Sequence, residues 1–259
     1  MSVTYPFQSA LVTGASSGIG EVMAGMLAVA GVPTVVVARR ADRLASLAER
    51  QPGIEVLVAD LATDAGQAAV VARIRDEQQP IELVVNNAGF GTSGDFRELD
   101  PDRLAEEIEV NVAALTRLSH AALSTMVPRG KGWLLNVSSF ASFQPAPHLA
   151  VYAATKAYVT SLSESLHEEA EPSGVHVTAL CPGLTKTEFQ RVSNTRHYSN
   201  DYPSMAWTSV DDVARTGLVD VVANKALSVP GVQYKVLSAL TNVTPRWLRR
   251  KASAKVRRD

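Results

Sequence analysis

The sequence predicts an α/β protein with one doubly wound parallel sheet of about seven strands and helices on both faces. Short apolar runs rich in Val and Leu alternate with longer segments in which apolar residues recur at helical spacing. The runs show little alternation of polar and apolar residues, as expected for strands that are covered on both faces. Helical spacing returns after the last run, which predicts a C-terminal helical extension.

The expected elements follow one another along nearly the whole chain. Strands are expected at 9–14, 34–38, 55–59, 82–86, 133–138 and 175–181, and a short run lies at 227–229. Helices are expected at 21–30, 40–49, 64–78, 102–126 and 152–169. Ser209 has the position of an N-cap, which predicts a helix over 210–223. Val236, Leu240, Val243 and Trp247 form an apolar stripe, and we expect a packed terminal helix there in preference to one lying on a membrane.

The chain has neither a low-complexity linker nor a repeat, so residues 1–259 are expected to form a single domain with its core over about 8–230. The least regular region, 187–208, is too long for a simple connection and is expected to be a substrate loop. It contains Tyr198, Tyr202, Met205 and Trp207. Residues 231–259 are expected to be a basic C-terminal extension.

The composition is that of an ordinary globular protein, with 46% of the 259 residues hydrophobic and 20% charged. Five His and one Cys leave little room for a structural metal site, so no metal is expected. Cys181 cannot form a disulfide within the chain, which fits a reducing compartment. The sequence lacks a signal-peptide pattern and an apolar run of about 18 residues, so we expect a cytoplasmic protein.

Positive charge gathers near the C-terminus. Residues 246–259 carry seven Arg or Lys and one Asp, a net charge of +6 that leaves about −7 on the 245 residues before them. Such a tail can bind anionic lipid or nucleic acid, but it is more often a solvated terminus. We therefore expect no nucleic-acid binding, and weak contact with a membrane surface is left open.

A glycine-rich turn, "TGASSGIG", joins the first expected strand to the first expected helix. Its Gly14, Gly18 and Gly20 permit a tight turn, and they let backbone N–H groups approach a pyrophosphate at the positive end of the helix. The spacing is G-x-x-x-G-x-G and differs from the common G-x-G-x-x-G pattern. Its place between strand and helix predicts a Rossmann-type dinucleotide-binding fold.

The end of the second expected strand, "VVVARR", bears on the choice of cofactor. A cofactor without a 2′-phosphate usually meets an Asp or Glu here, but this chain has Ala38 followed by Arg39 and Arg40. A guanidinium can bind a phosphate in bidentate fashion, whereas an acid would repel it. The alternative is that the arginines only begin a solvated helix with Asp42 and Arg43. We favour phosphate recognition and therefore NADP(H).

Two further strand ends carry candidate cofactor ligands. Asp60 ends the third strand, where its carboxylate could accept a hydrogen bond from adenine or cap the next helix, and both alternatives stay open. Asn87, Ala88 and Gly89 follow the fourth strand and suit close approach of the backbone to a nucleotide.

The motifs together resemble those of a known family. "TGASSGIG", "NNAG", Asn111 in "EVNVAAL", "NVSS" ending at Ser139, "YAATK" and "CPGLTKT" occur in the order and spacing of short-chain dehydrogenases/reductases of the compact type of about 250 residues. The match runs from about residue 8 to 230. This resemblance implies a catalytic tetrad of Asn111, Ser139, Tyr152 and Lys156, with Ser139 chosen because it lies thirteen residues before Tyr152.

Physical reasoning agrees with the roles that the resemblance implies. A carbonyl oxygen gains negative charge as hydride reaches its carbon, so Ser139 could hydrogen-bond that oxygen and Tyr152 could protonate it. Lys156 and an oxidised nicotinamide would lower the pKa of Tyr152. In the family the lysine also holds the nicotinamide ribose, and the asparagine orients a water in a proton relay. Structural roles in a strand-end turn for Ser139 and in helix-kink bonding for Asn111 are the alternatives.

The resemblance extends the cofactor site beyond the residues already named. It implies contacts from Ser16, Ser17, Ile19, Leu61, Tyr152, Lys156, Pro182, Gly183, Leu184, Thr185 and Thr187. Ser142 and the alanines after Asn111 stand where the family often has glycine. These exchanges of small residues concern fine geometry and leave the reaction unchanged.

The expected substrate pocket is largely apolar. Ser139, Phe140, Phe143, His148, Tyr152, Leu184 and Phe189 are its expected residues, with His148 as part of the wall. Such a pocket would suit a steroid, a ketoacyl compound or another lipid-like ketone or aldehyde.

The sequence thus predicts an NADPH-dependent carbonyl reductase that works in reverse as an alcohol dehydrogenase. The alternatives are an NAD-linked alcohol dehydrogenase of the same family and a non-catalytic nucleotide-binding redox sensor, which would not need the tetrad. An epimerase or dehydratase on an extended fold would need a second substrate lobe. The family is commonly dimeric or tetrameric, so a homo-oligomer is expected.

Overall fold

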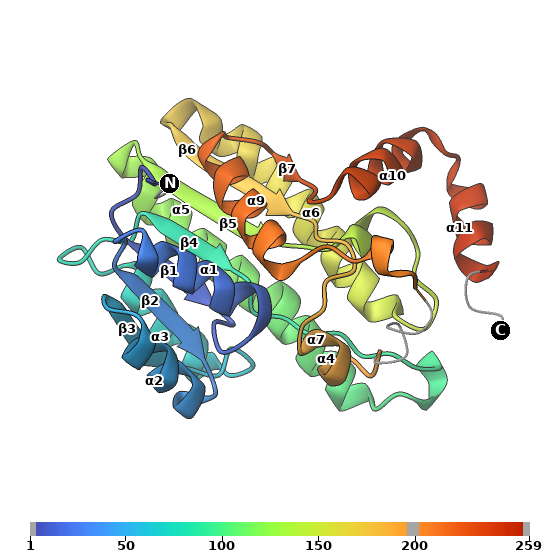
Figure 1. Ribbon diagram of the computed structural model, residues 1–259, viewed down its shortest axis with the longest axis horizontal. Coiled ribbons are helices and arrows are strands. Elements are labelled where there is room, and N and C mark those ends of the chain that lie inside the picture. Colours follow the sequence, from blue (N-terminus) through green and yellow to red (C-terminus); the bar gives the residue numbers. More distant parts are fainter. Residues whose placement is uncertain (1–3, 196–201, 256–259) are drawn as a thin grey trace.

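A sheet of seven parallel strands organises the computed structural model, which describes residues 4–195 and 202–255 (Figure 1). The strands run in the spatial order β3-β2-β1-β4-β5-β6-β7, and every adjacent pair is parallel. The strands are β1 (Ala10–Thr13), β2 (Thr34–Ala38), β3 (Ile54–Val58), β4 (Leu83–Asn86), β5 (Gly132–Val137), β6 (Val175–Leu180) and β7 (Leu227–Ser228). The order reverses between β1 and β4, which is where a doubly wound sheet opens a ligand crevice. The predicted fold class is confirmed.

Helices cover both faces of this sheet. One face packs against α1 (Gly18–Val29), α2 (Ala41–Arg50) and α9 (Val210–Val222). The other packs against α3 (Asp64–Ile74), α5 (Leu115–Arg129) and α6 (Ala150–Ala170). The central strands β1, β4 and β5 are therefore buried along their whole length, whereas the edge strand β3 exposes Val56 and Val58. This double cover explains the apolar runs without alternation.

A polar network crosses the core between β4 and β5. The Asn86 side-chain amide donates to Oδ1 of Asn136 at 2.9 Å and to Oγ of Ser119 at 3.1 Å. The Asn136 amide in turn donates to Oγ of Ser163 at 3.0 Å. Asn136 and Ser163 are fully buried. These bonds tie the two central strands to α5 and α6 directly below the carboxyl ends of the strands.

The segment predicted as one helix over 102–126 is instead divided into three parts. These are α4 (Pro101–Ile108), a π-helical segment (Glu109–Ala114) and α5. The π-helical segment contains Asn111, and such wide turns occur frequently at functional sites. Helix α3 ends at Ile74, short of the expected residue 78, while Ser209 caps α9 as predicted by accepting from the Asp212 N–H at 3.0 Å.

The C-terminal extension forms two helices, α10 (Val232–Val243) and α11 (Arg246–Lys255), which stand away from the sheet in Figure 1. The prediction of a packed terminal helix is wrong for Val236, Leu240 and Trp247, whose exposed fractions are 55%, 54% and 57%. The side chain of Val243 lies outside the described residues. Pro245 separates the helices because it has no N–H with which to continue α10.

The expected substrate loop, 187–208, contains short helices, and its two ends are joined by a β-bridge. It includes α7 (Phe189–Val192) and the 3-10 turn Ser204–Ala206, and a parallel bridge joins Thr185 to Thr208. Tyr198 falls within 196–201, outside the described residues.

Replacement of Asn136 by Ala should lower the free energy of unfolding by about 1–3 kcal/mol, because it leaves the Asn86 amide and the Ser163 hydroxyl short of a buried partner. Urea unfolding measures this change. The exposed Gln78→Ala is the control and should stay within about 0.5 kcal/mol of the wild type. An unchanged stability of Asn136→Ala would contradict this role for the network.

Candidate active site

A cavity of about 900 Å³ opens along the carboxyl edge of the sheet. Parallel strands deliver their following loops to this one edge, so motifs far apart in sequence meet there. The predicted site residues in its wall are Gly14, Ser16, Ser17, Gly18, Ile19, Arg39, Arg40, Asp60, Leu61, Asn87, Ala88, Gly89, Ser139, Phe140, Tyr152, Lys156, Pro182, Gly183, Leu184, Thr185, Thr187 and Phe189. Tyr202 and Met205 of the substrate loop also line it.

Four predicted site residues do not line the cavity. Gly20 packs inside the turn, where a Cβ would collide with the Asn87 side chain, and Asn111 is buried behind the wall. Phe143 and His148, which the sequence predicts in the substrate wall, are not among the residues that line the cavity, and their contact with a substrate stays a prediction. Phe143 packs edge-on against Phe140, with ring centroids 5.7 Å apart, and His148 is an exposed residue with φ of 64°.

The N-terminus of α1 suits the pyrophosphate of a dinucleotide. Gly14 and Gly18 have φ of 67° and 60°, a region that favours glycine, and a Cβ at Gly14 would come within 2.7 Å of the Asn87 amide. Ser17 is the N-cap, but its side chain makes no hydrogen bond to the helix. The first N–H groups of α1 are therefore free of a side-chain cap at the positive end of the helix, which favours an anion.

Arg40 connects the glycine-rich turn to the substrate loop. Its Nη2 donates to the hydroxyls of Ser16 and Ser17, both at 2.9 Å, and its Nη1 pairs with Glu188 at 2.7 Å. Arg40 is the N-cap residue of α2. Its side chain also binds two residues of the glycine-rich turn that line the cavity.

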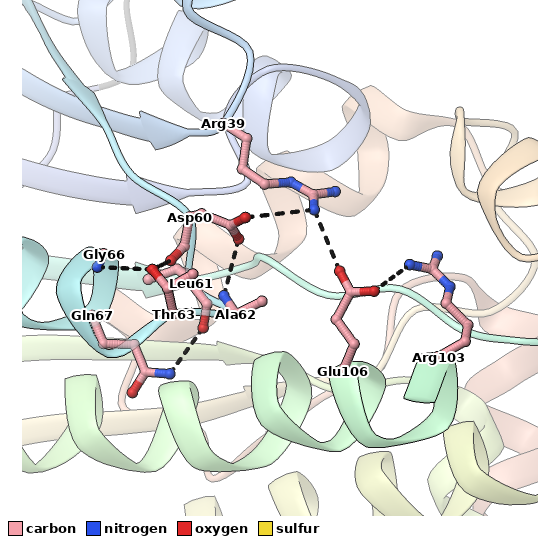
Figure 2. A network of polar contacts seen from close by, with 9 residues as sticks. All are labelled: Arg39, Asp60, Leu61, Ala62, Thr63, Gly66, Gln67, Arg103 and Glu106. Carbon is pink, nitrogen blue, oxygen red and sulfur yellow. Dashed lines mark hydrogen bonds and ion pairs between the residues drawn. The ribbon is translucent and has the colours of Figure 1, made fainter. Parts of the chain in front are cut away.

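Arg39 reaches a different set of partners, shown in Figure 2. Its Nη1 lies 3.4 Å from Glu106 and 3.9 Å from Asp60, and Glu106 also binds Arg103 at 2.8 Å. The Arg39 side chain is 58% exposed, so its guanidinium can reach a ligand in the cavity. Arg39 and Arg40 therefore both line the cavity, and each forms ion pairs with carboxylates.

Asp60 does not cap the helix that follows it. Its Oδ1 accepts from the Ala62 N–H at 3.0 Å, while Thr63 is the N-cap of α3 and accepts from the Gly66 N–H at 3.1 Å (Figure 2). Of the two alternatives left open by the sequence, the cap is therefore excluded. Asp60 lines the cavity beside Arg39.

Asn111 is buried and links two segments of the site through hydrogen bonds of its side chain. Its Nδ2 donates to the Phe90 carbonyl at 2.8 Å and to the Thr155 hydroxyl at 3.1 Å, and its Oδ1 accepts from the Phe90 N–H at 3.1 Å. These bonds join the loop after β4 to α6, which carries Tyr152 and Lys156. The contacts of its side chain are with other elements and not with its own helix.

Tyr152, Lys156 and Ser139 lie close together in the cavity wall. Lys156 Nζ donates to the Val137 carbonyl at 2.8 Å and lies 5.8 Å from the centroid of the Tyr152 ring. Burial raises the pKa of Tyr152 to about 12, against the lowering effect of its hydrogen bond with Ser139. Burial also lowers the pKa of Lys156 to about 8. In the protein alone, desolvation outweighs the influence of neighbouring groups on the pKa of Tyr152. The lowering expected from Lys156 together with an oxidised nicotinamide stays a prediction.

Two residues near the site gave no recognisable signal in the sequence. The Tyr234 hydroxyl accepts from the Leu184 N–H at 2.9 Å and donates to the Ala206 carbonyl at 2.7 Å, so α10 forms part of the cavity wall. Glu107 is fully buried, and burial raises its pKa while Arg103 and Lys156 lower it. A Tyr in an apolar helix and a Glu between Glu106 and Glu109 are unremarkable patterns, so neither could be singled out.

The structure describes no arrangement typical of a metal site or a membrane span. Within residues 4–195 and 202–255, no three His, Cys, Asp or Glu side chains are grouped so that they could hold a metal ion. The helices of this part of the chain include none that is long and apolar enough to cross a membrane.

A cavity that joins a glycine-rich helix N-terminus to a Ser–Tyr–Lys cluster is what a nucleotide-binding oxidoreductase requires. Comparison with known proteins agrees with this class. The family model described as "short chain dehydrogenase" matches residues 8–197. The chain belongs to the short-chain dehydrogenase family and is an oxidoreductase of that family.

Individual relatives cover most of the chain. An uncharacterized oxidoreductase of Myxococcus xanthus is 36% identical over 73% of this chain and 76% of its own length. A short-chain dehydrogenase from Sphingobium yanoikuyae, solved in complex with NADPH, is 34% identical with a TM-score of 0.82, covering 90% of this chain and 93% of its own. A bulky-bulky ketone specific alcohol dehydrogenase from Comamonas testosteroni is 30% identical with a TM-score of 0.78, covering 92% and 95%.

Replacement of Lys156 by Met should change how stability depends on pH. The pKa of this buried lysine falls from the usual 10.5 in the unfolded chain to about 8 in the folded protein. Below pH 8 the lysine is charged in both the folded and the unfolded state, and burial of that charge destabilises the folded state in full. Between these two values only the unfolded chain holds the proton. The free energy of unfolding of the wild type should therefore rise with pH relative to Lys156→Met, by up to about 3 kcal/mol.

Urea unfolding of both proteins between pH 7 and pH 10 measures this difference. Lys131→Met, at the surface, is the control variant. A constant difference between the wild type and Lys156→Met across this range would show that the lysine is not held in a desolvated site.

Proposed function

We propose that the protein is an NADP(H)-dependent oxidoreductase that interconverts a ketone or aldehyde and its alcohol, with Tyr152 as general acid and base. The observation that carries this proposal is the shared cavity wall of Ser139, Tyr152 and Lys156 on one side and the uncapped N-terminus of α1 on the other. The NADPH complex of the Sphingobium relative supports the cofactor.

The residues of the chain have separate parts in this reaction. When bound, the nicotinamide supplies or accepts the hydride. Ser139 and Tyr152 donate hydrogen bonds to the carbonyl oxygen, and Tyr152 transfers its proton as that oxygen becomes an alkoxide. Burial raises the pKa of Tyr152 to about 12, so the phenol is protonated near neutral pH, which is the form that reduction requires. Lys156, held by its hydrogen bond to the Val137 carbonyl, would bind the nicotinamide ribose beside the Tyr152 phenol.

The apolar residues that line the cavity support a bulky apolar carbonyl compound as the substrate class. Phe140, Leu184 and Met205 line the cavity, and the Phe189 ring lies 5.2 Å from that of Tyr152. Such a wall stabilises apolar groups on the substrate while Ser139 and Tyr152 orient its carbonyl. The ketone specificity given for the Comamonas relative supports this class.

An NAD-linked alcohol dehydrogenase is the second candidate. The observation that favours it is the set of carboxylates around the two arginines, with Asp60 and Glu106 beside Arg39 and Glu188 on Arg40. Against it, β2 ends in Ala38 and is followed by both arginines, so an acid at the strand end is missing. The exposed Arg39 favours a 2′-phosphate.

Replacement of Tyr152 by Phe should lower kcat with NADPH and a bulky ketone by roughly 100- to 10,000-fold, because the proton donor to the oxygen is removed. NADPH affinity, measured by fluorescence titration, should stay nearly unchanged. Tyr158→Phe is the matched control, since this half-exposed tyrosine of α6 bonds Thr116 away from the cavity. Normal turnover by Tyr152→Phe would refute the mechanism, and a panel of ketones, aldehydes and alcohols with both cofactors identifies the substrate used.

Replacement of Arg39 by Asp should weaken NADPH binding by about 10- to 100-fold, the range expected for a lost charge-assisted hydrogen bond. NADH binding should change far less, because NADH has no 2′-phosphate. Titration of both cofactors measures the ratio, with the exposed Arg43→Asp of α2 as the control for a general charge effect. Equal losses for the two cofactors would favour the NAD-linked candidate.

A further inference from the structure

Helices α10 and α11 present apolar side chains to solvent. On α10 the exposed fractions are 76% for Val232, 55% for Val236 and 54% for Leu240, and these residues recur every four positions along one side. On α11, Trp247 is 57% and Leu248 44% exposed. We call these five residues the C-terminal apolar stripe.

The stripe adjoins the mouth of the active-site cavity. Tyr234 and Leu237, on the same helix, line the cavity, and Leu237 is 45% exposed. Met205 also lines it and is 80% exposed. Helix α10 therefore carries both cavity-lining residues and exposed apolar residues of the stripe.

Helix α11 contacts the turn that follows Ser139 through a hydrogen bond. Arg249 Nη1 donates to the Phe143 carbonyl at 2.8 Å, and Lys251 Nζ lies 5.6 Å from the Trp247 ring centroid. The aromatic ring and basic groups thus gather on one short helix beside the turn that follows Ser139.

The charge of this segment differs from that of the rest of the chain. Residues 232–255 contain no Asp or Glu, and their basic residues are Lys235, Arg246, Arg249, Arg250, Lys251 and Lys255. With a formal charge of −1 for the whole chain and +7 for residues 232–259, residues 1–231 carry −8. An anionic surface would attract residues 232–259 and repel residues 1–231, so the protein would bind with its C-terminal helices toward the surface.

We propose that α10 and α11 dock the protein on the surface of an anionic phospholipid bilayer. Apolar residues with Trp on one side and basic residues beside them are the features with which helices lie in a bilayer interface. The contact is peripheral. It places the cavity mouth at the interface, and entry of an apolar substrate from the bilayer, which rests on the proposed function, follows from that position.

A second copy of the chain is a less suitable occupant. A symmetric contact would bring the same basic helices together, with like charges facing one another. The homo-oligomer expected from the family remains a prediction, and contact through the stripe is one outcome of the test below.

The test is co-sedimentation of the full chain, without cofactor or substrate, with vesicles of phosphatidylcholine alone or with added phosphatidylglycerol. The protein should pellet with the anionic vesicles at least tenfold more than with the neutral ones, and rising salt should release it. Trp fluorescence should shift to the blue on binding, and Trp247→Phe should lose that shift. Tyr152→Phe should bind as the wild type does, so failure of the proposed catalysis and failure of docking are distinguishable.

Paired variants locate the surface. Val236→Ser with Leu240→Ser, and separately Arg250→Glu with Lys251→Glu, should each reduce binding to anionic vesicles about tenfold or more. Val56→Ser with Val58→Ser, on the exposed edge strand β3, is the matched control and should bind normally. Thermal unfolding checks that every variant is folded.

Two results would overturn the proposal. One is equal or absent pelleting with both kinds of vesicle. The other is a change of the stripe variants from oligomer to monomer in sedimentation velocity while vesicle binding is unaffected, which would assign the stripe to a second copy.

Discussion

The parallel pairing of β4 with β5, in the register that sets Asn86 beside Asn136, is the constraint on which the site depends. The hydrogen bond between these two side-chain amides holds the strand ends together. Asn87–Gly89 and Ser139, for which cofactor and catalytic roles are proposed, follow these strand ends in the chain. The end of β5 also holds α6, because Ser138 Oγ donates to the Lys156 carbonyl and Lys156 Nζ donates to the Val137 carbonyl, both at 2.8 Å. One strand end thus sets the position of Ser139 and of the helix that carries Tyr152.

Desolvation is the dominant electrostatic influence within this framework. It acts in opposite directions on the two ionisable groups, raising the pKa of Tyr152 and lowering that of Lys156, and both shifts favour neutral side chains. The phenol therefore stays protonated near neutral pH, which is the form that the proposed reduction requires, and the charge of a bound cofactor would be needed to make the phenol a base. The part of the cavity around Arg39 and Arg40 differs, since both arginines remain partly exposed and form ion pairs with nearby acids.

The elements that could be predicted from the sequence are those determined by local pattern. Strand β2 occupies the expected residues 34–38, and Ser209 caps its helix, because burial on both faces and a capping side chain leave local signals. The π-helical turn at Asn111 and the cavity contact of Tyr234 could not be predicted, because each depends on partners distant in the chain, such as Thr155 and Leu184. Periodicity identified the stripe at Val236 and Leu240 but could not tell whether protein or solvent covers it. Phe140 and Phe143 are close in sequence but differ in position, since Phe140 lines the cavity and Phe143 packs against the Phe140 ring.

In the proposed reaction, hydride passes from NADPH to a carbonyl carbon in this cavity while Tyr152 supplies the proton. The most direct measurement is a single turnover of an apolar ketone with NADPH deuterated at the transferring position, followed by mass spectrometry of the product. The expected product is an alcohol with one deuterium on its carbinol carbon, formed together with an equal amount of oxidised cofactor. An alcohol without the label, or oxidised cofactor without alcohol, would contradict the proposed reaction.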